Sequence, residues 1–439
     1  MSKLPDSNKG QNGDVLVIGM ALFSMFFGAG NLIFPPTLGM TSGTSWFLGF
    51  LCFFIADIGL GFAAIIAMMK GSGRIKGITA PVGKIAAIII NTSVIVCIGP
   101  LLAIPRTAAT TFEMGVQPAT DSISLIVFSI IFFAITFALT IRPSGVIDII
   151  GKFLTPALFI CLIALIIVGF TTPLSTVQVP TSETVVKDGI LAGYQAMDVL
   201  GALGFAMIVI ATVIAKGYTT DRDKARVTAK SCAVSGIMLF IVYGGLTYLG
   251  ASSGSVFASE GLNQAGLLVA ITNGLLGKWG VLILGLVVGL ACLTTAVGLT
   301  SAAGSYFEEL TKGKLKYGVV VTIVILISLG FCNLGLTQII SLSAPILTVL
   351  YPVVIVLIVL AFFKKKLRNL NVHRTAVIVT FIVSLLSVAS GYTDSLAFIH
   401  KLPLDAYGFN WLLPAIVGGI VGRFIPYNGK TVEEIEETF

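Results

Sequence analysis

The sequence predicts an all-α integral membrane protein of about twelve transmembrane helices. Its composition, its long apolar runs and the placement of its basic residues all indicate this class. Of 439 residues, 56% are hydrophobic and 11% are charged, and the mean hydropathy is +1.02. Soluble domains contain roughly 25% charged residues. Because this chain has too few polar groups to cover a water-soluble fold, most of its surface must face lipid.

About twelve apolar runs account for the predicted helices. Each is long enough to cross a bilayer, whose hydrocarbon core takes about 20 helical residues to span. In chain order the runs cover 14–40, 45–69, 80–112, 122–141, 147–170, 188–215, 227–251, 279–307, 317–333, 336–363, 373–391 and 408–426. A shorter apolar stretch at 262–277 is interrupted by Asn263, Gln264 and Asn273, and it predicts a re-entrant or surface helix within a loop.

The basic residues lie almost entirely on one side of the predicted membrane. If both termini are cytoplasmic, every one of the 27 Lys and Arg residues is cytoplasmic except Arg106, Lys187, Lys278 and Lys401. This is the positive-inside bias of membrane proteins, and a wrong number of helices would destroy it. We therefore expect a multi-pass protein of the cell (plasma) membrane, in contact with lipid, with its N- and C-termini in the cytoplasm.

The remaining composition argues against several functional classes. The net charge of +7 comes from these short basic loops, so it does not indicate a nucleic-acid partner. The six cysteines are far apart in sequence, which excludes a zinc knuckle or a CxxC pair. The chain contains no HExxH or P-loop motif. We therefore expect neither enzymatic activity nor an organic cofactor.

The first apolar run contains residues that interrupt a helix in mid-membrane. Gly28, Gly30 and Asn31 lie near its centre, and Pro35 and Pro36 follow about one turn later. A glycine costs a helix roughly 1 kcal/mol and a proline about 3, which a bilayer tolerates only where the freed backbone groups find other partners. One explanation is a discontinuous helix that binds an ion or a zwitterion. The other is close helix packing through small residues with a proline kink.

The sixth run carries a similar interruption beside an acidic residue, because Gly193, Gly201 and Gly204 surround Asp198. A buried carboxylate in a membrane is a functional candidate, and a helix-terminal Asp paired with a loop is the alternative. Interrupted runs at positions one and six are what two inverted halves of five helices produce. Such paired breaks point to a transporter substrate site, whereas a channel needs a symmetric pore lining.

This pattern predicts the organisation of the whole chain. A cytoplasmic tail at 1–13 precedes a ten-helix transport core, whose two repeats cover 14–170 and 188–363. Two additional transmembrane helices follow at 373–426, and a cytoplasmic tail occupies 427–439. Free amides at a half-helix N-terminus attract a carboxylate, and free carbonyls attract an ammonium group or sodium. The two breaks therefore suit an amino acid.

The eighth run supplies hydroxyl groups in mid-membrane. Thr294, Thr295 and Thr300 lie within it, and hard cations such as sodium prefer oxygen ligands. A lone Thr in a membrane helix commonly bonds its own backbone, which is the alternative. These hydroxyls are therefore candidate ligands of a coupling ion.

Taken together, these motifs resemble those of the branched-chain amino acid:cation symporters of bacteria. The matching stretches are Phe27-Gly28-Ala29-Gly30-Asn31, Gly99-Pro100-Leu101, Pro105-Arg106-Thr107-Ala108, Met197-Asp198-Val199-Leu200-Gly201-Ala202, Ala291-Cys292-Leu293-Thr294-Thr295 and Asn333-Leu334-Gly335-Leu336. The resemblance implies sodium-driven uptake of leucine, isoleucine and valine. It also implies the fold of amino-acid/polyamine transporters and neurotransmitter–sodium symporters.

The resemblance further implies how the site is built, with the broken first helix facing the substrate carboxylate. The expected substrate-binding residues are Phe27, Gly28, Ala29, Gly30, Asn31, Ile98, Leu101, Asp198, Gly201, Leu203 and Phe205. The expected sodium ligands are carbonyls near Ser24 and Phe27, the carbonyl of Ala291 and the hydroxyls of Thr294 or Thr295. In the eighth run, the stretch 298–301 fits the same role.

Two questions stay open at this point. A proton carried by Asp198 or Asp57 is the alternative to sodium coupling. Arg106 is either an outer-gate cation paired with Glu113 or Asp121, or an ordinary interfacial arginine.

Overall fold

The computed structural model describes residues 7–427 apart from 71–74, 121, 142–145, 364–365 and 368, together with Gly429. Within these ranges the chain is helical and contains no strand. Seven helices are long and apolar enough to cross a membrane, and five shorter apolar helices accompany them. The predicted all-α class is therefore confirmed.

The first half of the chain contains five groups of helices besides one short helix. Their elements are α1 (Ser7–Phe26) and α2 (Ala29–Ser42), α3 (Trp46–Phe54) and α4 (Leu60–Lys70), the short α5 (Lys76–Thr79), α6 (Lys84–Val96) and α7 (Ala103–Thr111), α8 (Leu125–Ile141), and α9 (Val146–Thr171). Two wider π-type turns, Ile55–Gly59 and Cys97–Leu101, join α3 to α4 and α6 to α7.

The second half begins with another interrupted helix. Its elements are α10 (Val185–Ala196), α11 (Asp198–Ala215), α12 (Asp221–Ala251), the short α13 (Gly254–Phe257), α14 (Gln264–Leu310), α15 (Tyr317–Cys332), α16 (Leu336–Phe362), α17 (Asn371–Ala389) and α18 (Leu412–Phe424). Helix α14 consists of two helices that meet at Gly277, where the backbone is not helical, with φ 66° and ψ −170°. The first of them begins at Gln264 and corresponds to the stretch 262–277, which we predicted as a re-entrant or surface helix within a loop.

Helix α12 packs directly against the interrupted first helix, and small residues make this contact possible. A Cβ atom at Gly39 of α2 would collide with the backbone of Thr247, and one at Gly250 of α12 would collide with the backbone of Pro36. Glycines of this kind let membrane helices approach closely enough for dispersion contacts between their backbones. The same contact holds α2 in place below the break.

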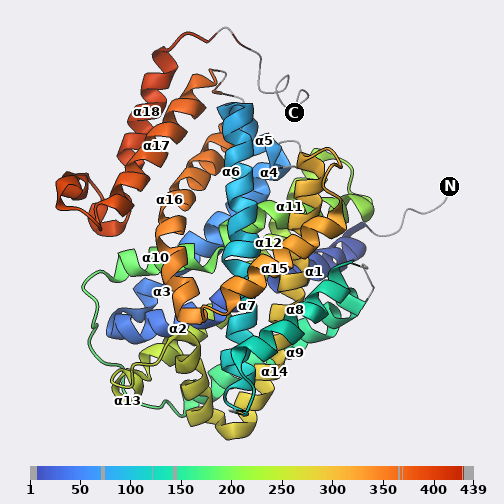
Figure 1. Ribbon diagram of the computed structural model, residues 1–439, viewed down its shortest axis with the longest axis vertical. Coiled ribbons are helices and arrows are strands. Elements are labelled where there is room, and N and C mark those ends of the chain that lie inside the picture. The colour runs from blue at the N-terminus through green and yellow to red at the C-terminus, as the bar shows by residue number, and fades with distance from the viewer. Residues whose placement is uncertain are drawn as a thin grey trace, which may run out of the picture.

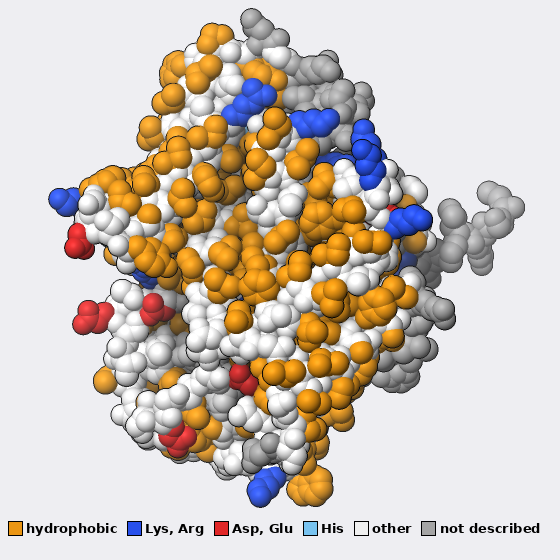
Figure 2. Space-filling view, viewed as in Figure 1, with side chains coloured by type: hydrophobic (Ala, Val, Ile, Leu, Met, Phe, Trp, Pro, Cys, Tyr) orange, Lys and Arg blue, Asp and Glu red, His pale blue; other side chains and the backbone are white. Residues whose placement is uncertain are grey.

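Helices α17 and α18 pack on each other and reach the rest of the bundle mainly through α16. Figure 1 shows them at one edge of the molecule, away from α9 and α14. The surface is apolar where lipid would lie: Ile126 of α8, Leu286 of α14 and Leu326 of α15 are more than half exposed. Figure 2 shows hydrophobic side chains across this face, with Lys and Arg gathered mostly toward its upper end.

Candidate functional site

The first interruption lies between α1 and α2. Helix α1 ends at Phe26, and Gly28 is extended, with φ −115° and ψ −175°, before α2 begins at Ala29. No side chain caps the N-terminus of α2, so its first amides carry partial positive charge without a side-chain acceptor. Pro35 and Pro36 remain inside α2. The glycine, rather than the prolines, therefore marks the break.

The second interruption lies between α10 and α11. Met197 adopts the left-handed conformation, with φ 69° and ψ 13°, and Asp198 is the first residue of α11. A left-handed non-glycine residue costs about 1–2 kcal/mol, so the surrounding contacts must hold this turn. The carboxylate of Asp198 stands at the positive end of α11, where the helix dipole favours it.

The guanidinium of Arg106 in α7 closes the end of α10. Nη1 donates to the carbonyl of Gln195 at 2.5 Å, and Nη2 donates to the carbonyl of Ala196 at 3.1 Å. The side chain is 3% exposed, and its charge lies 5.6 Å from the ring centre of Phe34. Arg106 therefore satisfies the last carbonyls of α10, at the helix end where a cation is favourable.

This position argues against an ordinary interfacial arginine and against a pairing of Arg106 with Glu113. A buried arginine bonded to α10 is not an ordinary interfacial residue. Glu113 is not its partner, because the Glu113 carboxylate accepts a hydrogen bond from Asn263 at 2.7 Å. Asp121 lies outside the described residues. The sequence could not show this contact because Gln195 and Ala196 are far from Arg106 along the chain.

Asn31 connects the first break to the second. Its Nδ2 lies within hydrogen-bond distance of three acceptors: the carbonyl of Phe26 at 2.7 Å, Asp198 Oδ2 at 2.5 Å and the hydroxyl of Tyr243 in α12. Its two hydrogens serve two of these acceptors at a time. All of these groups are buried. A single amide thus links the end of α1, the start of α11 and the middle of α12. Asn31 acts as a structural bridge beneath the cavity described next.

A second acid, Asp57, lies beside this network. It is fully buried in the turn Ile55–Gly59, and its carboxyl oxygens have no hydrogen-bond partner among the described residues. It lies close enough to Asp198 and Arg106 for electrostatic interaction with both. Two carboxyl groups and one guanidinium therefore share a buried region of low dielectric constant.

The two breaks face a common cavity with an empty volume of about 430 Å³, its mouth included. Its walls are Met25, Phe26, Gly28, Ala29, Gly30, Ile98, Ala103, Arg106, Thr107, Ala196, Met197, Asp198, Gly201, Phe205, Thr295 and Leu299. The lining is mostly apolar, with a few convergent polar groups from both breaks.

Many of the predicted substrate-binding residues line this cavity: Gly28, Ala29, Gly30, Ile98, Asp198, Gly201 and Phe205. Phe27, Asn31, Leu101 and Leu203 lie outside its lining. The ring of Phe27 stacks on Phe23, with centres 5.4 Å apart, and Leu203 is buried in the core. Arg106 also lines the cavity, although we did not predict it as a substrate-binding residue. The sequence did hold a signal for it, because a lone charged residue in a long apolar run indicates a functional role.

Two of the predicted ion ligands bond the backbone of their own helix. The hydroxyls of Thr294 and Thr295 both donate to the carbonyl of Ala291, at 2.9 and 3.0 Å. Such bonding is the alternative that we noted for these residues. Thr295 lines the cavity, whereas Ser24, Phe27, Ala291 and Thr294 lie outside its lining.

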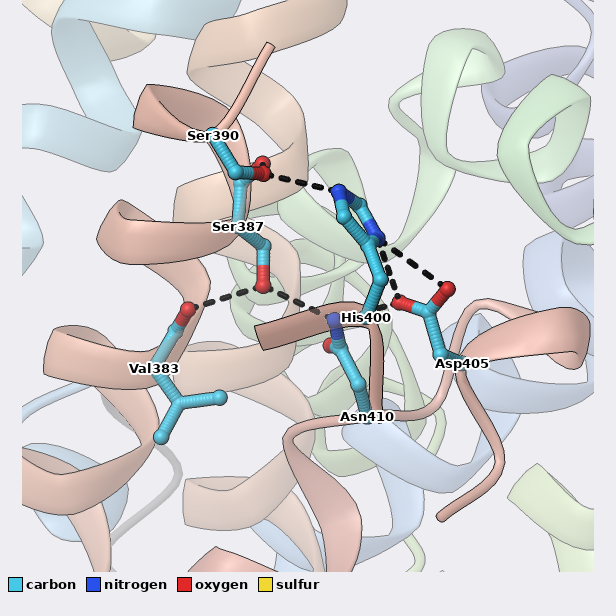
Figure 3. A network of polar contacts seen from close by, with 6 residues as sticks. All are labelled: Val383, Ser387, Ser390, His400, Asp405 and Asn410. Carbon is cyan, nitrogen blue, oxygen red and sulfur yellow. Dashed lines mark hydrogen bonds and ion pairs between the residues drawn. The ribbon is translucent and has the colours of Figure 1, made fainter. Parts of the chain in front are cut away.

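A separate polar network joins α17 to the loop before α18 (Figure 3). The imidazole of His400 lies 3.1 Å from Asp405 Oδ2 and 2.9 Å from the hydroxyl of Ser390. Asn410 donates to the hydroxyl of Ser387 and to Asp405, at 2.8 Å each. None of these residues lines the cavity, so the network serves to order this peripheral loop.

Comparison with known proteins gives consistent matches over nearly the whole chain. Residues 11–428 match the model of a family described as branched-chain amino acid transport protein. The branched-chain amino acid permease BraB of Bacillus subtilis (strain 168) is 36% identical over 422 residues, which cover 93% of this chain and 94% of the permease. The permease BrnQ of Escherichia coli (strain K12) is 32% identical over 413 residues, covering 92% and 93%.

Two solved structures share the arrangement of helices. Mhp1, a nucleobase-cation-symport-1 family transporter in a closed conformation with bromovinylhydantoin bound, matches with a TM-score of 0.65 at 13% identity, covering 97% of this chain and 96% of Mhp1. MhsT in complex with L-phenylalanine matches with a TM-score of 0.55 at 17% identity, covering 92% and 97%. At these identities the matches show a common fold.

Proposed function

Since this chain belongs to the branched-chain amino acid transport protein family, we propose that it imports leucine, isoleucine and valine in symport with sodium. The observation that carries the proposal is the meeting of two broken helices at one small, mostly apolar cavity. Paired breaks of this kind form substrate sites in secondary transporters.

The proposal includes a topology of twelve membrane spans in the cell membrane, with both termini in the cytoplasm. The first five spans and the next five would form inverted repeats, and α17 and α18 would be additional. Support comes from the seven long apolar helices and the five shorter ones. It also comes from the equivalent places of the breaks, at Gly28 in the first repeat and at Met197 in the second.

The cavity suits a branched aliphatic zwitterion. The uncapped amides of α2 favour a carboxylate, and Met25, Ile98, Phe205 and Leu299 offer apolar surface for a side chain. One methylene in such a pocket is worth about 1–3 kcal/mol. Leucine, isoleucine and valine should therefore compete within a modest range, and lysine or glutamate should compete poorly.

Sodium is proposed as the coupling ion because neutral oxygens gather on α14 at the cavity. The Ala291 carbonyl and the hydroxyls of Thr294 and Thr295 would hold it, together with carbonyls near Ser24 and Phe27 at the end of α1. Turning the two hydroxyls away from their backbone acceptor would present their lone pairs to the ion. The ion would then join α14 to the end of α1.

A proton is the second candidate, and one observation favours it. The carboxyl group of Asp57 is fully buried without a hydrogen-bond partner among the described residues, and it lies beside Asp198. Two adjacent carboxyl groups cannot both be ionised cheaply in a medium of low dielectric constant, so one of them would hold a proton.

Purified protein in proteoliposomes separates these candidates. Leucine uptake should follow an inward sodium gradient and should persist when the pH gradient is collapsed. Thr295→Ala should raise the sodium concentration for half-maximal uptake roughly five- to hundredfold, because it removes an interaction of about 1–3 kcal/mol. Saturating sodium should restore much of the rate.

Thr322→Ala is the matched control for this measurement. Its hydroxyl makes the same kind of bond, to the carbonyl of Gly318 at 2.8 Å, but on an exposed face of α15. It should leave the sodium dependence unchanged. Uptake that follows the pH gradient, ignores sodium and disappears in Asp198→Asn would replace the sodium proposal with the proton one.

A further inference from the structure

Arg106 is the cationic side chain among the residues that line the cavity. It reaches both breaks at once, because its guanidinium bonds the end of α10 and packs directly on Gly30 of α2. A Cβ atom built at Gly30 would lie 2.7 Å from Arg106 Nη2 and 3.2 Å from its Cζ. Only a glycine leaves room for the guanidinium in this place.

The hydrogen bonds of Arg106 leave donors unused. A guanidinium carries five N–H groups in a fixed plane, and the two bonds to α10 employ Nη1 and Nη2. Nε is buried and has no hydrogen-bond partner among the described residues. A charged donor buried without an acceptor is costly in a membrane protein, and such a group marks a ligand contact.

Groups of both charges lie around the cavity. The positive end of α2 and the guanidinium of Arg106 adjoin each other through Gly30. The carboxyl groups of Asp198 and Asp57 lie in the same buried region. The α10 carbonyls, which the sequence suggested for an ammonium group, already accept hydrogen bonds from Arg106.

We propose that Arg106 binds the carboxylate of the substrate, together with the free amides at the N-terminus of α2. This inference rests on the proposed function and names the residue that recognises the acidic end of the amino acid. The ammonium end then lies toward the carboxyl group of Asp198, since the α10 carbonyls already accept hydrogen bonds from Arg106. Arg106 is thereby a specificity-determining residue, and Gly30 is the position that admits it.

The test measures binding of two ligands that differ only in the recognised group. L-leucine has a carboxylate, and L-leucinamide has the same side chain and amino group with a neutral amide. Titration calorimetry on purified protein should show wild type preferring leucine by at least about 100-fold. Arg106→Gln should lose about 10- to 150-fold in leucine affinity and change leucinamide affinity by less than about threefold.

Arg106→Lys keeps the charge that closes α10 but loses the planar set of donors. It should therefore fold like wild type and still show a reduced preference for leucine over leucinamide. Arg226→Gln, on an exposed face of α12, is the matched control and should leave both affinities unchanged. If Arg106→Gln does not fold, the preference measured in Arg106→Lys decides the question.

The outcomes separate this inference from the proposed function. If wild type binds leucine and Arg106→Lys keeps the full preference for leucine over leucinamide, the role proposed for Arg106 is wrong and the proposed function stands. Equal loss of leucine and leucinamide in folded Arg106→Gln also overturns it, because the residue would then only hold α10 in place. Wild type that binds neither leucine, isoleucine nor valine overturns the proposed function itself.

Discussion

The two broken helices begin from similar sequences and are closed in different ways. At the first break, Asn31 in the first turn of α2 donates to the carbonyl of Phe26, and the N-terminus of α2 has no side-chain cap. At the second, Arg106 from a distant helix donates to the carbonyls that end α10, and the N-terminus of α11 has no side-chain cap either. Both breaks keep uncapped amides, whereas their carbonyls are satisfied by a neutral amide in one break and by a charged guanidinium in the other.

This comparison shows that a break in a membrane helix does not leave all of its backbone groups to a ligand. In lipid every backbone polar group needs a partner, and a folded protein supplies that partner from a side chain or leaves it to the ligand. At both breaks the carbonyls have side-chain partners, so the uncapped amides are the groups that a ligand can bind.

The largest effect should come from Gly30→Ala. A Cβ atom there would push Arg106 away from its position, which would free the α10 carbonyls and displace the guanidinium from the N-terminus of α2. We expect leucine affinity to fall more than about 100-fold, since two hydrogen bonds of a charged group are lost. Binding of radiolabelled leucine to purified protein measures this.

Gly28→Ala is the matched variant for that experiment. A Cβ atom at Gly28 meets no atom within 4 Å, and its φ of −115° suits any residue. Its methyl group would occupy cavity space without disturbing the fold, so the loss should stay below about tenfold. Equal losses in the two variants would show that the contact between Gly30 and Arg106 does not determine leucine affinity.

Asn31→Ala should have an intermediate effect, because it cuts the bridge between the breaks. The buried groups of Asp198 and Tyr243 would lose a donor that both now share. At about 1–3 kcal/mol for a buried polar group left unpaired, leucine affinity should fall roughly five- to hundredfold.

Asn91→Ala controls for the loss of any buried asparagine. Asn91 donates to the hydroxyl of Thr79 at 3.1 Å, and neither residue lines the cavity. This variant should lower thermal stability and leave leucine affinity intact. If Asn31→Ala behaves in the same way, then Asn31 supports the fold and not the coupling of the two breaks.

The smallest effect should come from Asp14→Asn. Asp14 near the start of α1 pairs with Lys216 at the end of α11, at 2.6 Å, and accepts a hydrogen bond from Tyr218. This pair joins the two broken helices at the ends that lie farthest from their breaks. Its side chains are 27% and 30% exposed, so it is worth at most about 1 kcal/mol.

Removing it should therefore speed leucine exchange less than about fivefold, and high salt should reduce the difference between variant and wild type. Lys224→Gln breaks a pair within α12 alone, between Lys224 and Asp221 at 2.8 Å, and should leave exchange unchanged. An Asp14→Asn variant that exchanges leucine at the wild-type rate in low salt would show that this pair does not restrain the two helices.

The sequence by itself determined where the helices lie and where two of them break. Length and hydropathy decide whether a segment can span lipid, and glycine beside polar residues weakens a helix locally, so both properties can be read from neighbouring residues. The predicted interruptions were found at Gly28 and at Met197. The predicted boundary of the short helix at 262–277 was also found, because the backbone leaves the helical conformation at Gly277.

Only the tertiary structure decided which freed groups remain free. Whether a carbonyl of α10 stays open depends on Arg106 of another helix, and whether Asp57 matters depends on its closeness to Asp198. Such contacts join residues that are far apart in the chain, and no local pattern records them. The sequence therefore located the site, while packing of separate helices decided which of its polar groups are left for a substrate.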